Sequence, residues 1–325
     1  MHQTVTRRHF ALGLAALTAL PAPGLAQSGA WRPNRPVRVI VPFPPGGATD
    51  MLARLIAQRL GDRLGQPLVI ENRPGGSGVV GSQALLGAPA DGHALILATG
   101  DTHTVLPAAN PKLPFDAAAF VPVTGIAAVV MALVARPGLG TADPAQFLAR
   151  ARAARPPLSY GSYGVATVSH AAGESIRQAA GIELTHVPYG GAGPAILAVT
   201  ADQVDCCIVP VAVANPQRSR ATMLAVASAE RFPLVPDLPT LSELGLPVVA
   251  DSWIGLLAAP GTPPAIAASI DAAVQQVLGG DILETLRGNG FSPLGFGPAR
   301  FADYLAAERE RWGRVVREAR ITIEG

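Results

Sequence analysis

The sequence contains few residues that could form covalent or metal cross-links. Its two cysteines, Cys206 and Cys207, are adjacent in a chain of 325 residues. Adjacent cysteines cannot form an ordinary disulfide clamp, and they lack the nearby Cys or His pair of a zinc site. We therefore interpret them as buried strand residues, and we predict no bound metal and no cofactor.

Charge of either sign is also scarce. The sequence has 25 basic and 23 acidic residues, and Lys112 is the only lysine. Without Arg7 and Arg8, which lie in an N-terminal segment free of acids, 25 − 2 = 23 basic residues remain against 23 acids. Nucleic-acid binding requires a surplus of basic residues that neutralise phosphates, so we predict no nucleic-acid partner.

Residues 1–26 have the three parts of an export signal. Arg7 and Arg8 precede the apolar stretch ALGLAALTAL, and a small-residue site ends at Ala26. The apolar stretch is too short for a membrane anchor, which needs about 20 residues. We expect cleavage near Ala26 and a periplasmic mature protein, with the Sec and twin-arginine export routes both open.

The rest of the chain alternates strand patterns, glycine turns and helix patterns. The segments VRVIVPF and LVIEN are each followed by a glycine turn and a helix pattern, and ALILATG is a third strand pattern. The uncharged run from Phe120 to Ala135 is interrupted by Pro122 and Gly125, so we interpret it as buried strands. Strand, turn and helix in succession favour a parallel α/β sheet.

The same order of elements begins again after this run, which favours two α/β domains. We expect them to be joined by two crossings, because a further strand pattern near residues 249–259 returns the chain to the first unit. After the signal at 1–26, domain 1 would comprise residues 27–128 and 251–325, and domain 2 residues 129–250.

Four glycine turns lie between the carboxyl end of a predicted strand and the amino end of a predicted helix. Unpaired N–H groups and the helix dipole favour an anion there, and glycine lets a ligand approach the backbone. We therefore predict a ligand site where these turns meet, and expect Gly47 to need a positive φ angle. The alternative is that the turns are only connections. They are PPGGATD (44–50), RPGGSGVVG (73–81), GSYGVATVSH (161–170) and YGGAGP (189–194).

Nine motifs extend over nearly all of the predicted mature chain. They are, in order, VPFPPGGATDMLAR, VIENRPGGSG, PADGHALILATG, LPFDAAAFVPV, YGSYGVATVSHAAGE, HVPYGGAGPAI, PDLPTLSELGLP, WIGLLAAPGTP and AERERWGRVV. In this order they resemble the Bug or TctC-like extracytoplasmic receptors of tripartite tricarboxylate transporters.

The resemblance implies a bilobal periplasmic binding protein of type II-like α/β fold, which closes on its ligand like a Venus flytrap. It further implies that the protein binds a small carboxylate between its domains and delivers it to the membrane subunits of a cognate transporter. It implies a monomer with no catalytic residues.

The resemblance also assigns candidate ligand-binding residues, which belong to the glycine turns and their neighbours. We interpret Asp50 chiefly as a residue that braces the first turn, because a carboxylate would repel an anion, and a structural role is the alternative for His170. The candidates are Phe43, Gly46, Gly47, Ala48, Thr49, Asp50, Ser77, Thr99, Ser162, Thr167, His170 and Tyr189.

The chain departs from the family pattern at polar positions. Val165 and Ala166 stand where relatives commonly have Asn-Gly, Gly190 replaces a common lysine, and the acid often found after Asp205 is absent. These departures favour a ligand with an apolar body.

Two enzyme classes are alternatives. The stretch Gly76 to Gly81 matches the dinucleotide pattern G-x-G-x-x-G, with Asp101 twenty residues after Gly81. An exported hydrolase could use Ser162 with a histidine, although the chain has neither a G-x-S-x-G nor an H-E-x-x-H motif.

Overall fold

The computed structural model describes residues 31–323, and the predicted export signal at 1–26 lies outside them. Within the described range, no helix has both the length and the apolar character that crossing a bilayer requires.

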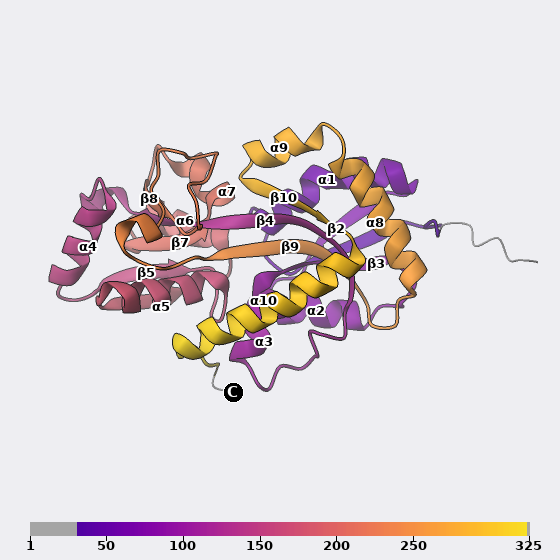
Figure 1. Ribbon diagram of the computed structural model, residues 1–325, viewed down its shortest axis with the longest axis horizontal. Helices are drawn as coiled ribbons and strands as arrows, with labels where there is room; N and C mark the ends of the chain where they lie inside the picture. Colours follow the sequence, from indigo (N-terminus) through magenta and orange to yellow (C-terminus); the bar gives the residue numbers. More distant parts are fainter. Residues whose placement is uncertain (1–30, 324–325) are drawn as a thin grey trace, which may run out of the picture. The chain divides into compact units, whose positions relative to one another are not determined.

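Ten strands form one mixed sheet in this part of the chain (Figure 1). They are β1 (Val37–Val41), β2 (Leu68–Asn72), β3 (Ala94–Thr99), β4 (Val121–Ala135), β5 (Leu158–Ser162), β6 (Leu184–Pro188), β7 (Cys206–Pro210), β8 (Thr222–Val226), β9 (Asp251–Ala258) and β10 (Phe291–Phe296). Their order is β2-β1-β3-β9-β4-β7-β5-β6, and β8 and β10 both pair with β4.

Two groups of parallel strands lie at opposite ends of this order. The first strand group is β1, β2 and β3, and the second strand group is β5, β6 and β7. The antiparallel strands β4 and β9 connect the groups, since β9 pairs with β3 while β4 pairs with both β9 and β7. The run that we interpreted as buried strands forms the single 15-residue strand β4.

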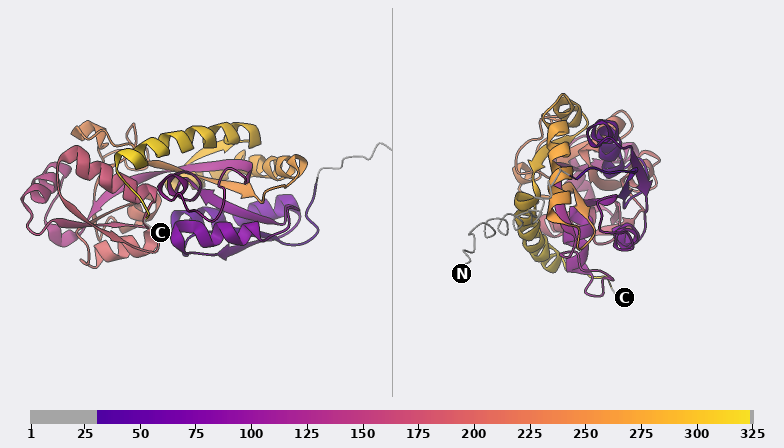
Figure 2. Two further views of the ribbon diagram at one scale, coloured as in Figure 1. Left: turned by 90° about the horizontal axis from the view of Figure 1, so that it is seen from below. Right: turned by 90° about the vertical axis from the view of Figure 1, so that its right-hand side faces the viewer.

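Ten α-helices accompany the strands in the described residues (Figures 1 and 2). They are α1 (Ala48–Leu64), α2 (Val79–Leu86), α3 (Leu106–Ala109), α4 (Pro144–Ala153), α5 (Val168–Ala180), α6 (Ala192–Thr200), α7 (Val211–Ala214), α8 (Pro264–Leu278), α9 (Ile282–Gly288) and α10 (Pro298–Glu318). The strand, turn and helix order predicted for both units is thus confirmed.

Helix α1 shows how the sequence determines a helix. Leu52, Ile56, Leu60 and Leu64 recur every four residues and are all buried, so one face of the helix packs on the sheet. Gly65 ends the helix in the left-handed region with a φ of 75°.

The φ angle expected for Gly47 is wrong. Gly47 has extended backbone with φ −81° and ψ 168°, and the left-handed residue of the turn is its neighbour Gly46, with φ 84°. Gly47 is the N-cap of α1, a position that normally takes extended backbone, so the chain reverses one residue earlier.

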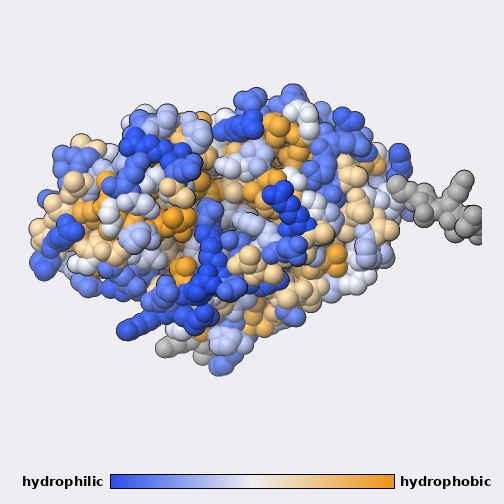
Figure 3. All heavy atoms as spheres, viewed as in Figure 1, coloured by the Kyte–Doolittle hydropathy of each residue, from blue (hydrophilic) through white to orange (hydrophobic). Residues whose placement is uncertain are grey.

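Helix α10 lies across β4 and contacts α5, which follows the first strand of the second group (Figure 1). Its outward face is hydrophilic (Figure 3) and carries Arg300, Asp303, Glu310, Arg314, Arg317 and Glu318. Its inward face includes Phe301 and Trp312, which are almost completely buried.

Phe301 packs into a space that two glycines leave free. Gly125 of β4 and Gly255 of β9 are register partners. A Cβ atom on Gly255 would lie 2.4 Å from Phe301 Cζ, and one on Gly125 would lie 2.9 Å from Phe301 Cδ2. The absence of side chains at this pair lets the phenyl ring of α10 contact the two connecting strands directly.

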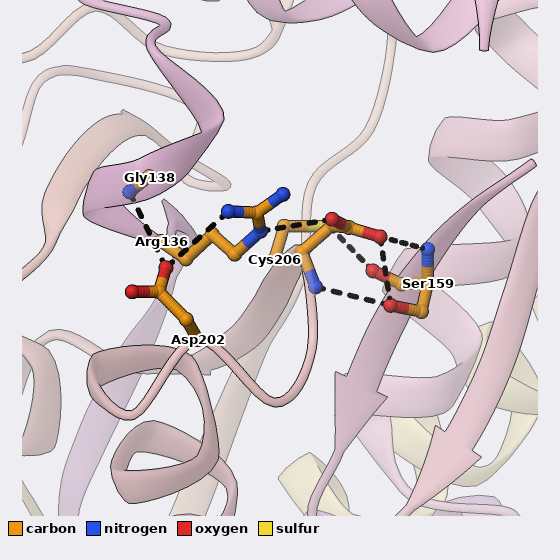
Figure 4. Close-up of polar contacts among 6 residues, drawn as sticks. Arg136, Gly138, Ser159, Asp202 and Cys206 are labelled. Carbon is orange, nitrogen blue, oxygen red and sulfur yellow. Dashed lines mark hydrogen bonds and ion pairs between the residues drawn. The ribbon is translucent and has the colours of Figure 1, made fainter.

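A polar network joins the end of β4 to β5 and β7 in the second strand group (Figure 4). Arg136 donates from Nε to Asp205 Oδ1 at 2.9 Å, and Asp205 Oδ2 accepts from the amide and hydroxyl of Ser159 at 2.8 and 2.9 Å. Burial raises the pKa of the Asp205 carboxyl, but the hydrogen bonds from Ser159 and Arg136 outweigh it and keep that pKa below its usual range. The adjacent Cys206 and Cys207 are free and buried, as predicted.

Candidate functional site

Two hollows lie where turns of the two strand groups meet. The smaller one, here called the turn cavity, has a volume of about 30 Å³. Its walls are Phe43, Pro44, Pro45, Gly47, Ala48, Thr49, Thr99, Asp101, Val129, Tyr163, Gly191, Ala192, Gly193, Pro194, Pro210, Ser252 and Ile254.

The larger hollow, here called the outer groove, has a volume of about 760 Å³ and shares Phe43, Pro44 and Tyr163 with the turn cavity. Its other walls are Pro42, residues 74–79, Leu106, Asn110, Gly164, Val165, Pro188, Tyr189, Gly190 and Ile323. All four predicted turns therefore contribute to one of the two hollows.

The candidate residues divide into three sets. Phe43, Gly47, Ala48, Thr49 and Thr99 line the turn cavity, and Phe43, Ser77 and Tyr189 line the outer groove. Gly46, Asp50, Ser162, Thr167 and His170 are not among the residues that line either hollow.

The amino end of α1 is open towards the turn cavity. The first amides of a helix have no acceptor within the helix, which here applies to Gly47, Ala48 and Thr49. The N-cap residue, Gly47, has no side chain that could accept from them instead. A helix amino end of this kind combines free N–H groups with the positive end of the helix dipole.

The Asp50 side chain fixes the conformation of the same turn. Its carboxylate accepts from the Gly46 amide at 3.0 Å and from the side chains of Arg54 and Asn72. Burial raises the pKa of the Asp50 carboxyl, but the hydrogen bonds from Arg54, Gly46 and Asn72 outweigh it and keep that pKa below its usual range. These contacts agree with the bracing role that we interpreted for Asp50.

The amino end of α6 is a second open helix end at the turn cavity. Its N-cap, Gly191, also provides no side-chain hydrogen bond, and Ala192 and Gly193 follow it along the cavity wall. A Cβ atom on Gly191 would lie 3.0 Å from Pro44 Cδ, so this glycine permits the close approach of the two turns. The turn cavity thus receives amide groups from both strand groups.

The amino end of α5 is closed by groups of the protein itself. Thr167 Oγ1 accepts from the His170 amide, and Asp101 Oδ1 accepts from the Val168 amide at 2.7 Å. Ser162 is completely buried, with its hydroxyl bonded to Gly164 O and next to His186. The predicted contact of Ser162 and Thr167 with a ligand stays a prediction, since internal partners occupy both hydroxyls.

Three polar residues of the turn cavity were missed as binding residues by the sequence analysis. Tyr163 donates its hydroxyl to Asp101 Oδ1 at 2.9 Å. Burial raises the pKa of the Asp101 carboxyl above its usual range, while the hydrogen bonds from Val168, Tyr163 and Thr99 oppose that shift. Ser252 is 3% exposed, and its hydroxyl has no hydrogen-bond partner among the described residues.

The glycines of the G-x-G-x-x-G match have packing reasons. A Cβ atom on Gly78 would lie 2.3 Å from Thr102 Cγ2, and one on Gly81 would lie 2.8 Å from Pro42 Cβ. Neighbouring side chains of the protein thus occupy the space beside both glycines, which accounts for the pattern without a dinucleotide.

His170 lies in a stack of two histidines. Its ring is parallel to that of His186 within 7°, with centroids 4.1 Å apart, and its Nδ1 accepts from the Ala166 amide at 3.2 Å. Burial, followed by the charge of His170, lowers the pKa of His186 to about 4, and burial also lowers the pKa of His170. These contacts favour the structural alternative for His170.

We expect acidification to destabilise the protein through this stack. The pKa of His186 in the folded protein is below the unfolded value of about 6.5, so the unfolded chain binds protons first as the pH falls. Stability that is fully present above pH 6.5 is then lost between about pH 6.5 and 4, and the share due to His186, reduced by solvent screening of its partly exposed ring, is on the order of 1 to 2 kcal/mol.

Denaturant unfolding of the parent and of His186→Asn, at a pH above and a pH within this range, measures the effect. The variant should lose less unfolding free energy between the two conditions than the parent. Equal losses in the two proteins would contradict the expectation.

The chain is similar to proteins of one family along nearly its whole length. Residues 52–321 match the family described as "Tripartite tricarboxylate transporter family receptor". The protein BugT of Bordetella pertussis is 31% identical, with 97% of this chain and 98% of BugT covered.

Two solved structures from Rhodopseudomonas palustris have the same fold. Rpa4515 with adipate is 34% identical with a TM-score of 0.86, and the match covers 89% of this chain and 99% of that one. MatC with bound malate is also 34% identical, with a TM-score of 0.82 and coverage of 87% and 99%.

These similarities confirm the predicted fold class, an α/β periplasmic binding protein fold, and the prediction that the protein is a receptor and not an enzyme. The enzyme alternatives are thereby wrong. The chain belongs to the tripartite tricarboxylate transporter receptor family.

Proposed function

We propose that this receptor acts in the periplasm as a monomer, binds a small organic carboxylate in the turn cavity and delivers it to the membrane subunits of its transporter. The observation that carries the proposal is the meeting of two uncapped helix amino ends, those of α1 and α6, at one cavity. Amides at helix amino ends favour a carboxylate, and the unpartnered hydroxyl of Ser252 provides a further polar group in the same wall. The adipate and malate named for the two neighbours are carboxylates of this kind.

Ligand entry requires the walls of the turn cavity to separate, because about 30 Å³ holds little more than water. We propose that the two strand groups belong to two domains, residues 27–128 with 251–325 and residues 129–250. In this arrangement β4 and β9, the strands that connect the groups, bend when the domains open. In the closed arrangement Ser77 Oγ of the first proposed domain donates to Val165 O of the second at 2.7 Å, and opening would break this hydrogen bond.

A thermal-shift screen of mono-, di- and tricarboxylates tests the function. A ligand at about 100 times its Kd should raise the free energy of unfolding by about 2.7 kcal/mol, and the amide analogue of that ligand should have little effect. Small-angle scattering on the same samples should give a smaller radius of gyration with ligand. The proposal is wrong if no carboxylate shifts the transition, or if the amide analogue acts as strongly as the acid.

A further inference from the structure

The turn cavity is lined by groups of opposite electrostatic character. The open amino ends of α1 and α6 supply amides to its wall. Asp101 is the only charged residue among the described residues that line the cavity. A ligand in this cavity therefore meets both hydrogen-bond donors and a carboxyl group.

Asp101 is held in place by three donors. Its Oδ1 accepts from Tyr163 Oη at 2.9 Å and from the Val168 amide at 2.7 Å, and its Oδ2 accepts from Thr99 Oγ1 at 3.0 Å. The side chain is 4% exposed, so a rotation away from the cavity would leave these donors buried without an acceptor. A ligand consequently has to fit Asp101 where it lies.

The position of Asp101 also removes a third anion site. Val168 is the first residue of α5, and its amide would be free at the helix amino end if Asp101 did not accept from it. A carboxylate of the protein thus occupies, at α5, the place that is open at α1 and α6. A ligand with carboxylates at both ends would bring its second charge against Asp101 in a buried space with no basic residue in the walls.

Asp101 still has room for one more donor. Oδ1 accepts from two groups, Tyr163 Oη and the Val168 amide, whereas Oδ2 accepts from one other side chain, Thr99, which leaves Oδ2 able to accept a further donor. A hydrogen-bond donor at the far end of the ligand can take the remaining position, and a cationic donor would also neutralise the buried charge.

We propose that Asp101 determines the ligand class: the receptor takes a monocarboxylate whose other end carries a hydrogen-bond donor, best an ammonium group, and rejects dicarboxylates. The inference rests on the proposed function, since it assumes that the ligand carboxylate lies at the open ends of α1 and α6.

Calorimetry with three matched series of acids tests the inference. The probes are α,ω-dicarboxylates, ω-amino acids and unsubstituted monocarboxylates with two to six carbons between their ends, which differ only in the far group. For the parent protein we expect the best ω-amino acid to bind at least 10-fold more tightly than the dicarboxylate of equal length. The unsubstituted acid should lie between them.

Asp101→Asn is the matched variant, because it keeps the shape and an oxygen acceptor for Val168 and Tyr163 while it removes the charge. We expect the preference for the amino acid over the dicarboxylate to fall at least 10-fold. Asp62→Asn, an exposed position on α1, changes the net charge equally and should leave the preference unchanged.

The outcomes separate the two proposals. If dicarboxylates bind the parent as tightly as the amino acids, the role of Asp101 is wrong while the carboxylate function stands, and this result does not depend on the variant folding. An unchanged preference in folded Asp101→Asn likewise overturns the role of Asp101. If none of the acids binds the parent, the proposed carboxylate site fails, and the inference fails with it.

Discussion

Replacing Ala48 with proline is expected to weaken carboxylate binding about 10- to 100-fold and to leave the fold intact. Ala48 is the first residue of α1, a position that accepts proline because its N–H has no helical acceptor. Gly47 has the extended backbone that the residue before a proline requires. The substitution removes one amide donor from the turn cavity, and a lost charge-assisted hydrogen bond costs about 1.5 to 3 kcal/mol.

Calorimetry on the parent, Ala48→Pro and Ala48→Gly measures this effect, with circular dichroism to establish folding. Ala48→Gly keeps the amide and removes only the methyl group, so it should bind within a few-fold of the parent. Parent-like binding by a folded Ala48→Pro would mean that the amides of α1 do not hold the ligand.

Gly255→Ala is expected to be the most destabilising single-methyl change in the sheet. The added Cβ atom would lie 2.4 Å from Phe301 Cζ and 2.7 Å from the backbone oxygen of Thr124. Phe301 is fully buried and packs edge-to-face on Trp253 with ring centroids 5.4 Å apart, so neither ring has free space to enter. Overpacking of this kind costs about 3 kcal/mol or more, and we expect poor yield of folded protein or a large drop in Tm.

Gly288→Ala is the control, because a Cβ atom on this residue of α9 has no atom within 4 Å. Thermal unfolding of both variants should show a Tm close to that of the parent for Gly288→Ala. Similar Tm values for the two variants would contradict this expectation and show that Phe301 and the sheet can adjust to the added methyl group.

The strands, long helices and turns could be predicted because their signals are local. The β-branched residues of β1 and the four-residue spacing of buried leucines and isoleucine in α1 are visible within a few residues. The boundaries of α8 are equally local, since Pro264 stands at its first position and Gly279 follows its last residue, Leu278. Glycine-rich helix starts likewise indicated which turns contribute to the hollows.

The polar residues Asp101 and Ser252 of the turn cavity could not be predicted as ligand contacts, because their positions depend on contacts between distant segments. Asp101 accepts from Val168, 67 residues away, and Ser252 reaches the cavity from β9. From the sequence, Asp101 was noticed only as the acid of a dinucleotide pattern. A single sequence gives no register between β3 and the start of α5, so these partners could not be assigned.

The backbone of the turn before α5 explains one departure from the family pattern. Ala166, which stands where relatives commonly have glycine, has a φ of 55°. This left-handed region costs an alanine roughly 1 kcal/mol, whereas glycine adopts it readily. The common glycine at this turn is therefore explained by backbone geometry, and the departure says less about ligand polarity than we inferred.

The pairing of β3 with β9 joins distant parts of the chain and is expected to slow folding. Leu95 of β3 pairs with Ala258 of β9, a separation of 258 − 95 = 163 residues. Such non-local pairing gives a high contact order, and the entropy of closing so long a loop slows folding. In the central strand pair, Val121 of β4 lies opposite Ala258 of β9, a separation of 258 − 121 = 137 residues, so the strands proposed to bend on ligand entry also form through slow non-local pairing.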